Sequence, residues 1–350
     1  MAQMFKTGEF ADLFSAERGG TDAADCSSDS KYDAAPALLS KEESKIYYTH
    51  IHLPSMVRLE ACTLCQLRCA GCGVQKGGND GLGRGYLTIE NFTRFCDMNP
   101  FVRRIELSNY GEIFLNPDLV KIMHHAKKKG ILLSAHNGSN FNTVSDEQML
   151  ALVETGFRSI SLSIDGASQQ TYSKYRIGGD FDRVIENIRK LLALKKEAGS
   201  EYPELSWQFI LMEHNELDIG KAKELAAELG IPIRFKYNWD PSYKPIHREY
   251  IMRETGLGEL TVAESRANHK FDPYEFFCYQ IFFTPQINWD GRLLGCSRNR
   301  YATFDVNVFE VGLAKALRSP GYIAAKECLL RCIRTKRSTE TASASAARSV

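Results

Sequence analysis

Short apolar runs and longer amphipathic segments alternate along the chain from about residue 56. A short apolar run bounded by Gly or polar residues is typical of a buried parallel strand, and apolar residues three or four positions apart are typical of a helix. Six runs have the strand pattern: Val57–Ala61, Val102–Leu107, Ile131–Ala135, Ser159–Ile164, Ser206–Leu211 and Ile233–Tyr237. The pattern therefore predicts six consecutive strand–helix units.

Helix boundary signals lie between these runs. Ser145 begins a capping box that Gln148 completes, and Gly156 marks the end of that helix. Asn116 precedes Pro117, which predicts an N-cap followed by proline at the first helical position. The other predicted boundaries are helix starts at Thr88 and Asp180 and helix ends at Gly130 and Gly230. These signals separate the successive strands by helices.

Six such units imply parallel strands joined by right-handed crossovers. A complete eight-unit barrel takes about 250 residues, whereas the block from 51 to 245 is shorter. The sequence therefore predicts an α/β fold in which residues 51–245 form a partial (β/α)6 barrel of the TIM type. In such barrels the chemistry gathers on the loops after the carboxyl ends of the strands.

The strand–helix alternation stops at about residue 246. Farther on, Phe282–Ile287 and Arg292–Gly295 flank an Asp-Gly pair, which predicts a β-hairpin. Residues 246–333 are therefore predicted to form a small α+β subdomain. Residues 1–50 are predicted to be a partly disordered extension and residues 334–350 a disordered tail, because both are rich in small and polar residues.

Composition narrows the class of protein. Apolar residues make up 43% and charged residues 25% of 350 residues, which is typical of a globular protein. The formal net charge is +1, so no basic field attracts nucleic acid or an anionic membrane. The sequence has no apolar run long enough to span a membrane and no apolar core of a signal peptide at its start. Clustered thiols in such a chain predict a cytoplasmic location.

Four of the ten cysteines lie within one short stretch, Glu60–Gly73. Neither the ferredoxin spacing nor the two separated pairs of a zinc site fits this stretch. The inner triplet, Cys65-x3-Cys69-x2-Cys72, fits three thiolates that bind three irons of a 4Fe–4S cluster and leave the fourth iron open. A disulfide or a structural zinc site is the alternative.

This triplet resembles the signature of the radical S-adenosylmethionine superfamily. The resemblance implies that the open iron binds the amino and carboxylate groups of S-adenosylmethionine. It also implies reductive cleavage to a 5′-deoxyadenosyl radical, which abstracts a hydrogen from the substrate. Gly71 stands where family members usually carry a large apolar residue near the adenine.

Further motifs after the predicted strands resemble the cofactor-binding motifs of that family. Tyr110-Gly-Glu is similar to the Gly-Gly-Glu motif that holds the amino group, and Ser-Ile-Asp-Gly followed by an arginine is similar to a motif near the ribose and carboxylate. The residues that the resemblance assigns to S-adenosylmethionine are Gly111, Glu112, Asn137, Ser163, Arg176 and Asn215. The alternatives are a solvated loop acid at Glu112, an ordinary turn at Asn137 and a surface arginine at Arg176.

Four more cysteines follow the barrel: Cys278, Cys296, Cys328 and Cys332. Their layout resembles the twitch module, the shorter form of the SPASM module, which implies an auxiliary 4Fe–4S cluster. The last two are three residues apart in place of the usual two. A four-thiolate zinc site is the alternative. Cys62 is predicted to be a wall residue and Cys96 a core residue. The glycine-rich stretch Gly77–Gly85 is predicted to be a flexible loop.

The resemblance implies an enzyme that oxidises or epimerises its substrate, with the auxiliary cluster as electron acceptor or substrate anchor. A small carbohydrate-like or natural-product metabolite is the favoured substrate, and a flavodoxin or ferredoxin is the expected electron donor. Modification of a peptide or protein is one alternative, and a non-catalytic zinc or iron–sulfur protein is another. No catalytic base is assigned. Polar residues after the fifth strand and around the sixth are expected to bind substrate or lie at the surface: His214, Lys236, Asn238 and Asp240.

Overall fold

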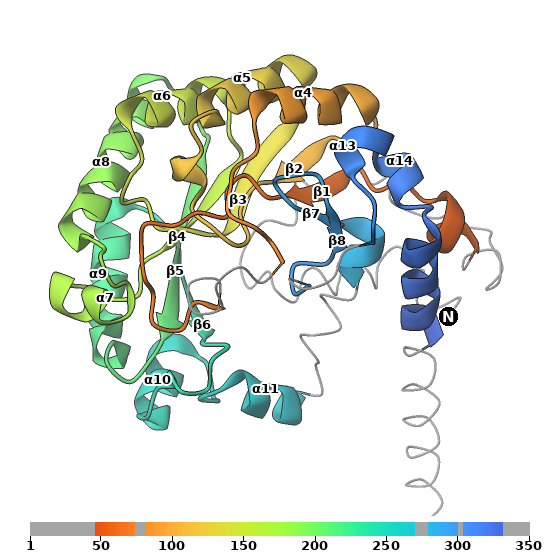
Figure 1. The fold of residues 1–350 in the computed structure, drawn as a ribbon. Helices are drawn as coiled ribbons and strands as arrows, with labels where there is room; N and C mark the ends of the chain where they lie inside the picture. The colour runs from red at the N-terminus through yellow and green to blue at the C-terminus, as the bar shows by residue number, and fades with distance from the viewer. Residues whose placement is uncertain (1–45, 74–80, 270–278, 300–303, 332–350) are drawn as a thin grey trace, which may run out of the picture.

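The computed structural model describes residues 46–73, 81–269, 279–299 and 304–331. In these residues the chain forms an eight-stranded sheet in the order β6-β5-β4-β3-β2-β1-β7-β8. The strands are β1 (Met56–Leu59), β2 (Arg104–Glu106), β3 (Leu132–Ser139), β4 (Ser159–Ser163), β5 (Glu204–Leu211), β6 (Ile233–Tyr237), β7 (Gln286–Ile287) and β8 (Leu293–Gly295). Helices cover the outside of the curved sheet (Figure 1).

All neighbouring pairs from β1 to β6 are parallel. The helices that lie wholly within the described residues are α4 (Ile89–Met98), α5 (Leu119–Lys129), α6 (Asp146–Thr155), α7 (Gln169–Tyr175), α8 (Phe181–Glu197), α9 (Ile219–Leu229), α10 (Arg248–Thr255), α11 (Val262–His269), α13 (Val308–Val311) and α14 (Leu313–Ala316). Short turns of other helix types are η2 (Tyr47–Ile51), η3 (Ile113–Leu115) and η4 (Glu216–Asp218). The predicted α/β fold with six strand–helix units is confirmed.

Most predicted helix boundaries are also confirmed. Thr88, Ser145 and Asp180 each accept a hydrogen bond from a backbone N–H in the first turn of the helix that follows. The three predicted terminal glycines adopt the left-handed conformation that ends a helix: Gly130, Gly156 and Gly230. Local chemistry therefore fixes these ends.

The predicted helix start at Pro117 is wrong, although the Asn116 side chain makes the expected capping contact, because its Oδ1 accepts from Asp118 N at 2.8 Å. α5 begins two residues later, after Asp118. The Asn116 side chain is buried, and its Nδ2 donates to the carbonyls of Ala61 and Leu87, each at 2.9 Å. These bonds join segments far apart in the sequence, and no local pattern reports them.

The two faces of the parallel sheet differ in composition. Side chains alternate along a strand, and residues paired across neighbouring strands point to the same side. The outer face, which packs against the helices, carries buried apolar residues: Val57, Leu59, Ile105, Leu133, Ala135, Ile160, Leu162, Leu205, Trp207, Phe209 and Leu211. We call the opposite side the inner face; its members are Met56, Arg58, Arg104, Glu106, Leu132, Ser134, His136, Ser159, Ser161, Ser163, Glu204, Ser206, Gln208, Ile210, Arg234 and Lys236.

The predicted C-terminal hairpin is confirmed, and it joins the barrel sheet. β7 and β8 are antiparallel, while β7 also pairs in parallel with β1 through Arg58↔Gln286 and Leu59↔Ile287. The first part of the predicted strand run is wrong, because residues 279–283 are helical and Phe283 packs against Tyr48 at a ring distance of 5.5 Å. A short apolar run does not distinguish a buried strand from a buried helix.

Part of the predicted N-terminal extension is ordered. Residues 46–50 lie within the described region, and η2 includes Tyr48, which is buried. The Nζ of buried Lys326 points to the carbonyls of Tyr48 and Thr49 at 3.4 and 3.3 Å. Residues 1–45 and the predicted tail at 334–350 lie outside the described residues. No helix in the described part of the chain has both the length and the apolar character that crossing a membrane requires.

Candidate functional site

The cysteine loop follows β1 and lies over the carboxyl ends of the strands. Its first residues are fixed by backbone hydrogen bonds, from Ala61 N to Leu107 O at 3.0 Å and from Leu87 N to Ala61 O at 2.9 Å. Cys65, Cys69 and Cys72 then belong to one apolar cluster with Leu67, Ala70, Tyr175, Ile210, Met212 and Tyr243. The structure thus brings the predicted triplet together.

Two neighbouring segments hold this loop. Arg68 N donates to Ile177 O at 2.9 Å and Ala70 N donates to Tyr175 O at 3.1 Å, which ties the loop to the end of α7. On the other side, Glu112 N donates to Leu64 O at 2.8 Å. The loop is therefore clamped between the segments that follow β2 and β4.

The surroundings of the three thiols include two side-chain donors. All three are free, and among the described residues no three His, Cys, Asp or Glu side chains meet at a point that could hold one metal ion. A 4Fe–4S cluster does not require such a point, because each thiolate binds a different iron. Asn140 Nδ2 lies 3.7 Å from the Sγ of Cys65, and an Nη1 of Arg176 lies 3.7 Å from the Sγ of Cys69. Donors to the sulfurs are typical of iron–sulfur sites.

Glu112 is buried beside this loop. Its carboxylate accepts hydrogen bonds from Ser139 Oγ at 2.7 Å, Asn140 N at 2.6 Å and Phe114 N at 3.3 Å. Burial raises the pKa of Glu112 despite these bonds. The alternative of a solvated loop acid is therefore wrong, while its contact with the amino group of S-adenosylmethionine stays a prediction.

Gly111 permits the close approach of two loops. A Cβ at this position would lie 2.2 Å from Cys62 O and 2.7 Å from Leu64 O, so no other residue fits without moving the backbone. The requirement for glycine here is steric. It brings Glu112 against the cysteine loop.

Arg176 forms a buried ion pair with Asp165. Its Nε and Nη2 both lie 2.6 Å from Asp165 Oδ2, and the side chains are 13% and 0% exposed. Burial opposes the charged form, but Asp165 and Cys69 outweigh it, so the pKa of Arg176 is raised. The surface-arginine alternative is wrong. Its predicted contact with the carboxylate of S-adenosylmethionine remains a prediction.

The three other predicted cofactor residues lie in different settings. Asn137 is exposed on β3 and donates to Ser108 O at 2.8 Å. Ser163 is buried and lies against Gly138. A Cβ on Gly138 would be 2.1 Å from Ser163 Oγ. Asn215 is fully buried, and its amide bonds the backbone of Asp165, Ile210 and Met212. The Asn215 amide thus already has backbone partners.

Two of the four cysteines of the predicted auxiliary site lie within the described residues. Cys278 and Cys332 lie outside the described residues, Cys296 is half-buried and Cys328 is exposed. The segment after Cys296 contacts the loop after β2, because Tyr110 Oη donates to Ser297 O at 3.1 Å. Arg298 lies 5.0 Å over the ring of Trp239, which follows β6. This segment therefore crosses from the β2 side of the barrel to the β6 side.

The two other cysteines of the barrel, Cys62 and Cys96, are both buried. The Sγ of buried Cys62 accepts a hydrogen bond from Leu64 N at 3.3 Å, and burial raises the pKa of this thiol to about 12. Cys96 is buried on α4. Cys96 therefore belongs to the core, whereas the role of Cys62 as a wall residue stays a prediction.

The described part of the glycine-rich stretch is not a free loop. Leu82 O accepts hydrogen bonds from Asn288 Nδ2 at 2.7 Å and from Trp289 Nε1 at 3.1 Å. Arg292 Nη2 donates to the same carbonyl at 2.8 Å. The β7–β8 hairpin therefore fastens this stretch, and residues 74–80 lie outside the described residues.

The polar inner face includes residues that sequence reasoning missed. His136 Nε2 lies 3.2 Å from Ser159 Oγ, and Arg58 Nη2 donates to Asn137 Oδ1 at 3.3 Å. The missed inner-face residues with polar or charged side chains include Arg58, Arg104, Glu106, Ser134, His136, Gln208 and Arg234. The signal was the strict alternation in Ser159–Ser163 and Ile233–Tyr237, which indicates one polar face.

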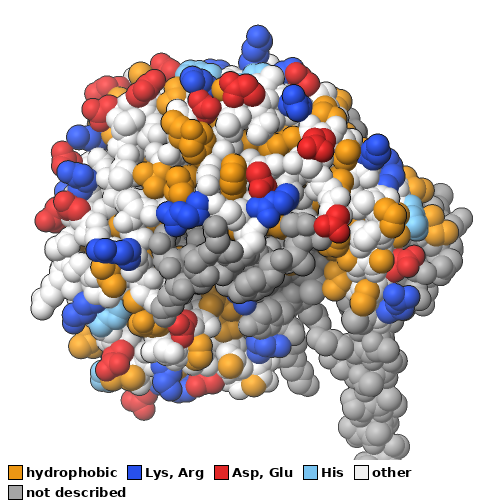
Figure 2. Space-filling view, in the orientation of Figure 1, with side chains coloured by type: hydrophobic (Ala, Val, Ile, Leu, Met, Phe, Trp, Pro, Cys, Tyr) orange, Lys and Arg blue, Asp and Glu red, His pale blue; other side chains and the backbone are white. Residues whose placement is uncertain are grey.

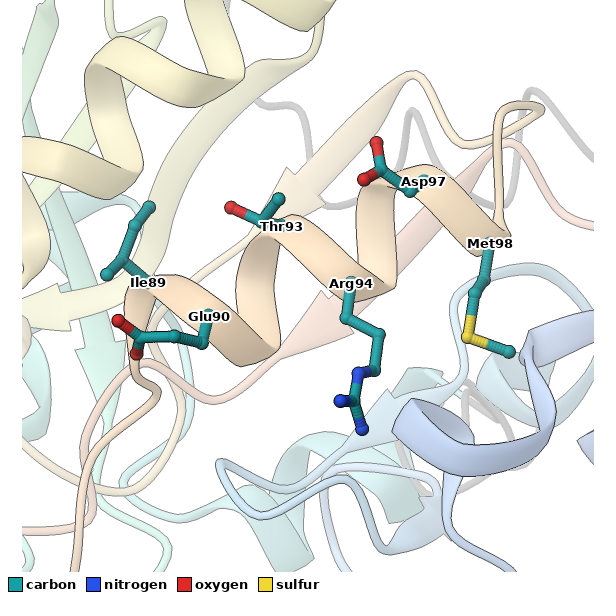
Figure 3. Close-up of a pocket in the computed structure, with 6 residues that line it drawn as sticks. All are labelled: Ile89, Glu90, Thr93, Arg94, Asp97 and Met98. Atoms are coloured by element: carbon teal, nitrogen blue, oxygen red, sulfur yellow. The ribbon is translucent and has the colours of Figure 1, made fainter.

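A surface hollow lies elsewhere (Figure 3). Its lining residues all come from one side of α4: Ile89, Glu90, Thr93, Arg94, Asp97 and Met98. Phe92, Phe95 and Cys96 on the other side of this helix are buried. The hollow is therefore separate from the cysteine loop.

Comparisons of the amino-acid sequence match part of this chain to one family model and to related proteins. Residues 59–212 match the family model described as Radical SAM superfamily. The chain is 27% identical over 180 residues to the AdoMet-dependent heme synthase of Methanosarcina barkeri, which covers 51% of this chain and 48% of that protein. It is 24% identical over 178 residues to the probable GTP 3',8-cyclase of Methanocaldococcus jannaschii, covering 50% and 55%. These matches span about half the length of each relative.

Solved structures share the fold. SuiB of Streptococcus suis bound to S-adenosylmethionine has a TM-score of 0.61 at 14% identity, covering 82% of this chain and 71% of SuiB. SuiB bound to its precursor peptide SuiA has a TM-score of 0.60 at 14% identity, covering 91% and 77%. Native anSMEcpe with bound AdoMet has a TM-score of 0.53 at 13% identity, covering 76% and 81%.

Proposed function

The chain contains a radical SAM domain at residues 59–212, and from this premise we propose that it abstracts a hydrogen from a small polar metabolite. Cys65, Cys69 and Cys72 would hold the 4Fe–4S cluster. When bound, this cluster supplies the electron that cleaves S-adenosylmethionine to a 5′-deoxyadenosyl radical. The observation that carries the proposal is the meeting of the three thiols beside Glu112 and Arg176.

The chain's own residues would bind and orient the cofactors. Asn140 and Arg176 donate toward the sulfurs of Cys65 and Cys69, contacts that would support thiolates bound to iron. Burial raises the pKa of both free thiols, and Arg176 offsets only part of this rise at Cys69. Glu112 would accept from the amino group of S-adenosylmethionine, and Arg176 would bind its carboxylate through the nitrogen not engaged by Asp165. Asn137 and Ser163 would line the ribose side.

The reaction is proposed to be an oxidation or epimerisation of a carbohydrate-like or natural-product metabolite. An auxiliary 4Fe–4S cluster at Cys278, Cys296, Cys328 and Cys332 would accept an electron or anchor the substrate. The polar inner face supports a polar substrate. A flavodoxin or ferredoxin in the cytoplasm would supply electrons.

Anaerobic reconstitution tests the proposal through iron content and 5′-deoxyadenosine formation. The wild type is expected to bind roughly eight irons, two cubanes of four, and to form 5′-deoxyadenosine. The Cys65/Cys69/Cys72→Ala variant should lose cleavage, and the Cys278/Cys296/Cys328/Cys332→Ala variant should lose about four irons. Cys96→Ala is the matched control. A loaded wild type that does not cleave S-adenosylmethionine would overturn the proposal.

Peptide modification is the second candidate function. It is favoured by the likeness to SuiB bound to the peptide SuiA, which spans 91% of this chain. To distinguish the two candidate functions, cell extract is added to the enzyme and the stimulation of 5′-deoxyadenosine formation is measured. Protease digestion of the extract abolishes the stimulation by a peptide and preserves that by a small metabolite.

A further inference from the structure

Glu60 anchors the loop that follows β2. It comes directly after β1, and its side chain is buried. Glu60 Oε1 accepts from Tyr110 N at 3.1 Å and from Gly111 N at 3.3 Å, and Oε2 lies 3.2 Å from Tyr110 N. One carboxyl group therefore binds two consecutive backbone N–H groups of this loop.

The next residue of the loop, Glu112, is held by the cysteine loop. Glu112 N donates to Leu64 O at 2.8 Å, and Gly111 allows this close approach because it has no Cβ. Three consecutive N–H groups of the β2 loop thus have acceptors on the segment that follows β1. These bonds fix the backbone from which the Glu112 side chain extends toward Ser139 and Asn140.

The side chain of Tyr110 is a second anchor of the same loop. Its ring packs in a buried cluster with Leu82 and Leu294. Its Oη donates to Ser297 O at 3.1 Å and to Asn299 O at 3.2 Å. Tyr110 therefore joins the β2 loop to the segment that follows β8.

Both anchors reach residues beyond the family match, which ends at residue 212. Glu60 N donates to Ile287 O at 2.9 Å, so the backbone of Glu60 takes part in the pairing of β1 with β7. Ser297 N donates to Gln280 Oε1 at 2.7 Å, which fixes the segment that Tyr110 contacts. The C-terminal hairpin thus has two separate links to the loop that carries Glu112.

Loss of the Glu60 acceptor has a physical cost. Two backbone N–H groups would lose their partner, and an unpaired backbone group away from water is destabilising. The β2 loop would relax toward other positions, and Glu112 would move with it. A group that binds a ligand has to be held within a fraction of an ångström of its binding position. The anchor is therefore suited to set the position of the Glu112 carboxylate.

We propose that Glu60 and Tyr110 are positioning residues, which hold Glu112 where it binds the amino group of S-adenosylmethionine. This inference rests on the proposed function, because that contact of Glu112 is part of it. Glu60 acts through the backbone of residues 110 and 111, and Tyr110 acts through the C-terminal hairpin. Neither side chain needs to contact the cofactor.

Calorimetry of S-adenosylmethionine binding tests the inference on the full-length protein, reconstituted anaerobically. Reductant is left out, so that the cofactor is bound and not cleaved. Glu60→Leu removes the acceptor and should weaken binding roughly tenfold, the scale on which residues of one hydrogen-bond network couple. Tyr110→Phe keeps the ring, removes the bonds to residues 297 and 299, and should weaken binding roughly threefold.

Two control variants separate positioning from a general loss of structure. Burial raises the pKa of Glu60 to about 8, and Glu60→Gln keeps both an oxygen acceptor and the uncharged state that burial favours. This variant should bind S-adenosylmethionine like the wild type. Tyr322→Phe removes another buried hydroxyl that donates to a backbone carbonyl, Ile281 O at 2.7 Å, and should also bind like the wild type. Iron content and circular dichroism verify that each variant is loaded and folded.

A double-mutant cycle shows whether Glu60 acts through Glu112. Glu112→Gln removes the charge that would face the amino group, and should itself weaken S-adenosylmethionine. In that background Glu60→Leu should add little further loss, because the contact that a displaced loop would disturb is already gone. Additive losses in the double variant would overturn the inference.

A loaded Glu60→Leu protein with wild-type affinity would also overturn it, and so would a Tyr110→Phe protein that binds as tightly as Tyr322→Phe. If Glu60→Leu does not fold, Tyr110→Phe decides. Formation of 5′-deoxyadenosine by the wild type with reductant reports separately on the proposed function. Cleavage by the wild type with unchanged affinity in the variants rejects only the positioning role. A loaded wild type that neither binds nor cleaves S-adenosylmethionine rejects the proposed function itself.

Discussion

The two faces of one sheet have opposite chemistry. The outer face places Trp207 and Phe209 of β5 in the core, fully buried. The inner face of the same strand carries Ser206 and Gln208. A complete TIM barrel fills its interior with branched apolar side chains, but here the interior positions are largely polar. The outer face therefore belongs to the apolar core, whereas the inner face carries mostly polar side chains, several of them buried.

The solvent surface of the helices adds a contrast within the same molecule. Acidic and basic side chains are interspersed over it (Figure 2). Arg189 and Glu228 form an ion pair there, 54% and 61% exposed. Charges on the helices are hydrated, while charges such as Arg58 on the inner face are half-buried. A half-buried charge on the inner face therefore interacts more strongly with its neighbours than a hydrated charge on the helix surface.

The largest expected effect comes from the outer face. Trp207→Ala removes a fully buried side chain whose Nε1 donates to Ile164 O at 2.7 Å, and should lower the free energy of unfolding by about 3–5 kcal/mol. Gln208→Ala, its inner-face neighbour, should cost less than about 1 kcal/mol. Urea unfolding followed by circular dichroism measures both. Equal losses would break the contrast between the faces.

A paired charge at the carboxyl ends of the strands should also matter. Asp165→Asn leaves Arg176 buried without its carboxylate and should cost about 3 kcal/mol. Asp182→Asn on the exposed side of α8 is the control and should change little. Guanidinium-induced unfolding of the two variants compares them. A loss no greater than that of the control would mean that the ion pair contributes nothing.

The pH dependence tests the burial of Glu60. Its folded pKa of about 8 exceeds the ordinary 4.5, so the folded state keeps a proton that the unfolded state releases between these values. The stability from this group is complete below pH 4.5 and is lost as pH rises through 8. Glu60→Gln should reduce the fall in unfolding free energy between pH 5 and 8 by about 3–4 kcal/mol. Unfolding curves at both values decide; an unchanged pH slope would contradict the assignment.

The smallest effect belongs to the helix surface. Arg189→Gln removes the exposed ion pair with Glu228 and should change the unfolding free energy by less than about 0.5 kcal/mol. Thermal unfolding at low and high salt measures it. A larger, salt-dependent loss would show that the surface charges also carry stability.

The sequence predicted the strands well because their apolar sides and their boundaries are local features. β6 matches its predicted range, Ile233–Tyr237, because polar and apolar residues alternate within it between clear breaks. The start of α5 was predicted two residues too early, and the bonds from Asn116 to Ala61 and Leu87, which are distant in the sequence, were not foreseen. The pairing of β7 with β1 is likewise a long-range contact.

The candidate site was only partly predictable. Spacing alone selected Cys65, Cys69 and Cys72, which the fold brings together. Ligand spacing does not report burial, so the ion pair of Arg176 with Asp165 was not foreseen. The polar inner face had a signal in its alternation, but the strands were read as buried on both sides.

The position of β1 between β2 and β7 has a consequence for synthesis. Arg58 pairs with Gln286, so β1 leaves the ribosome long before its second neighbour exists. Until the hairpin emerges, β1 is an open edge, and an open edge is a template for association with other chains. During synthesis the sheet therefore stays open at β1, the strand that precedes the cysteine loop. It can close there only after almost the whole described chain has been translated.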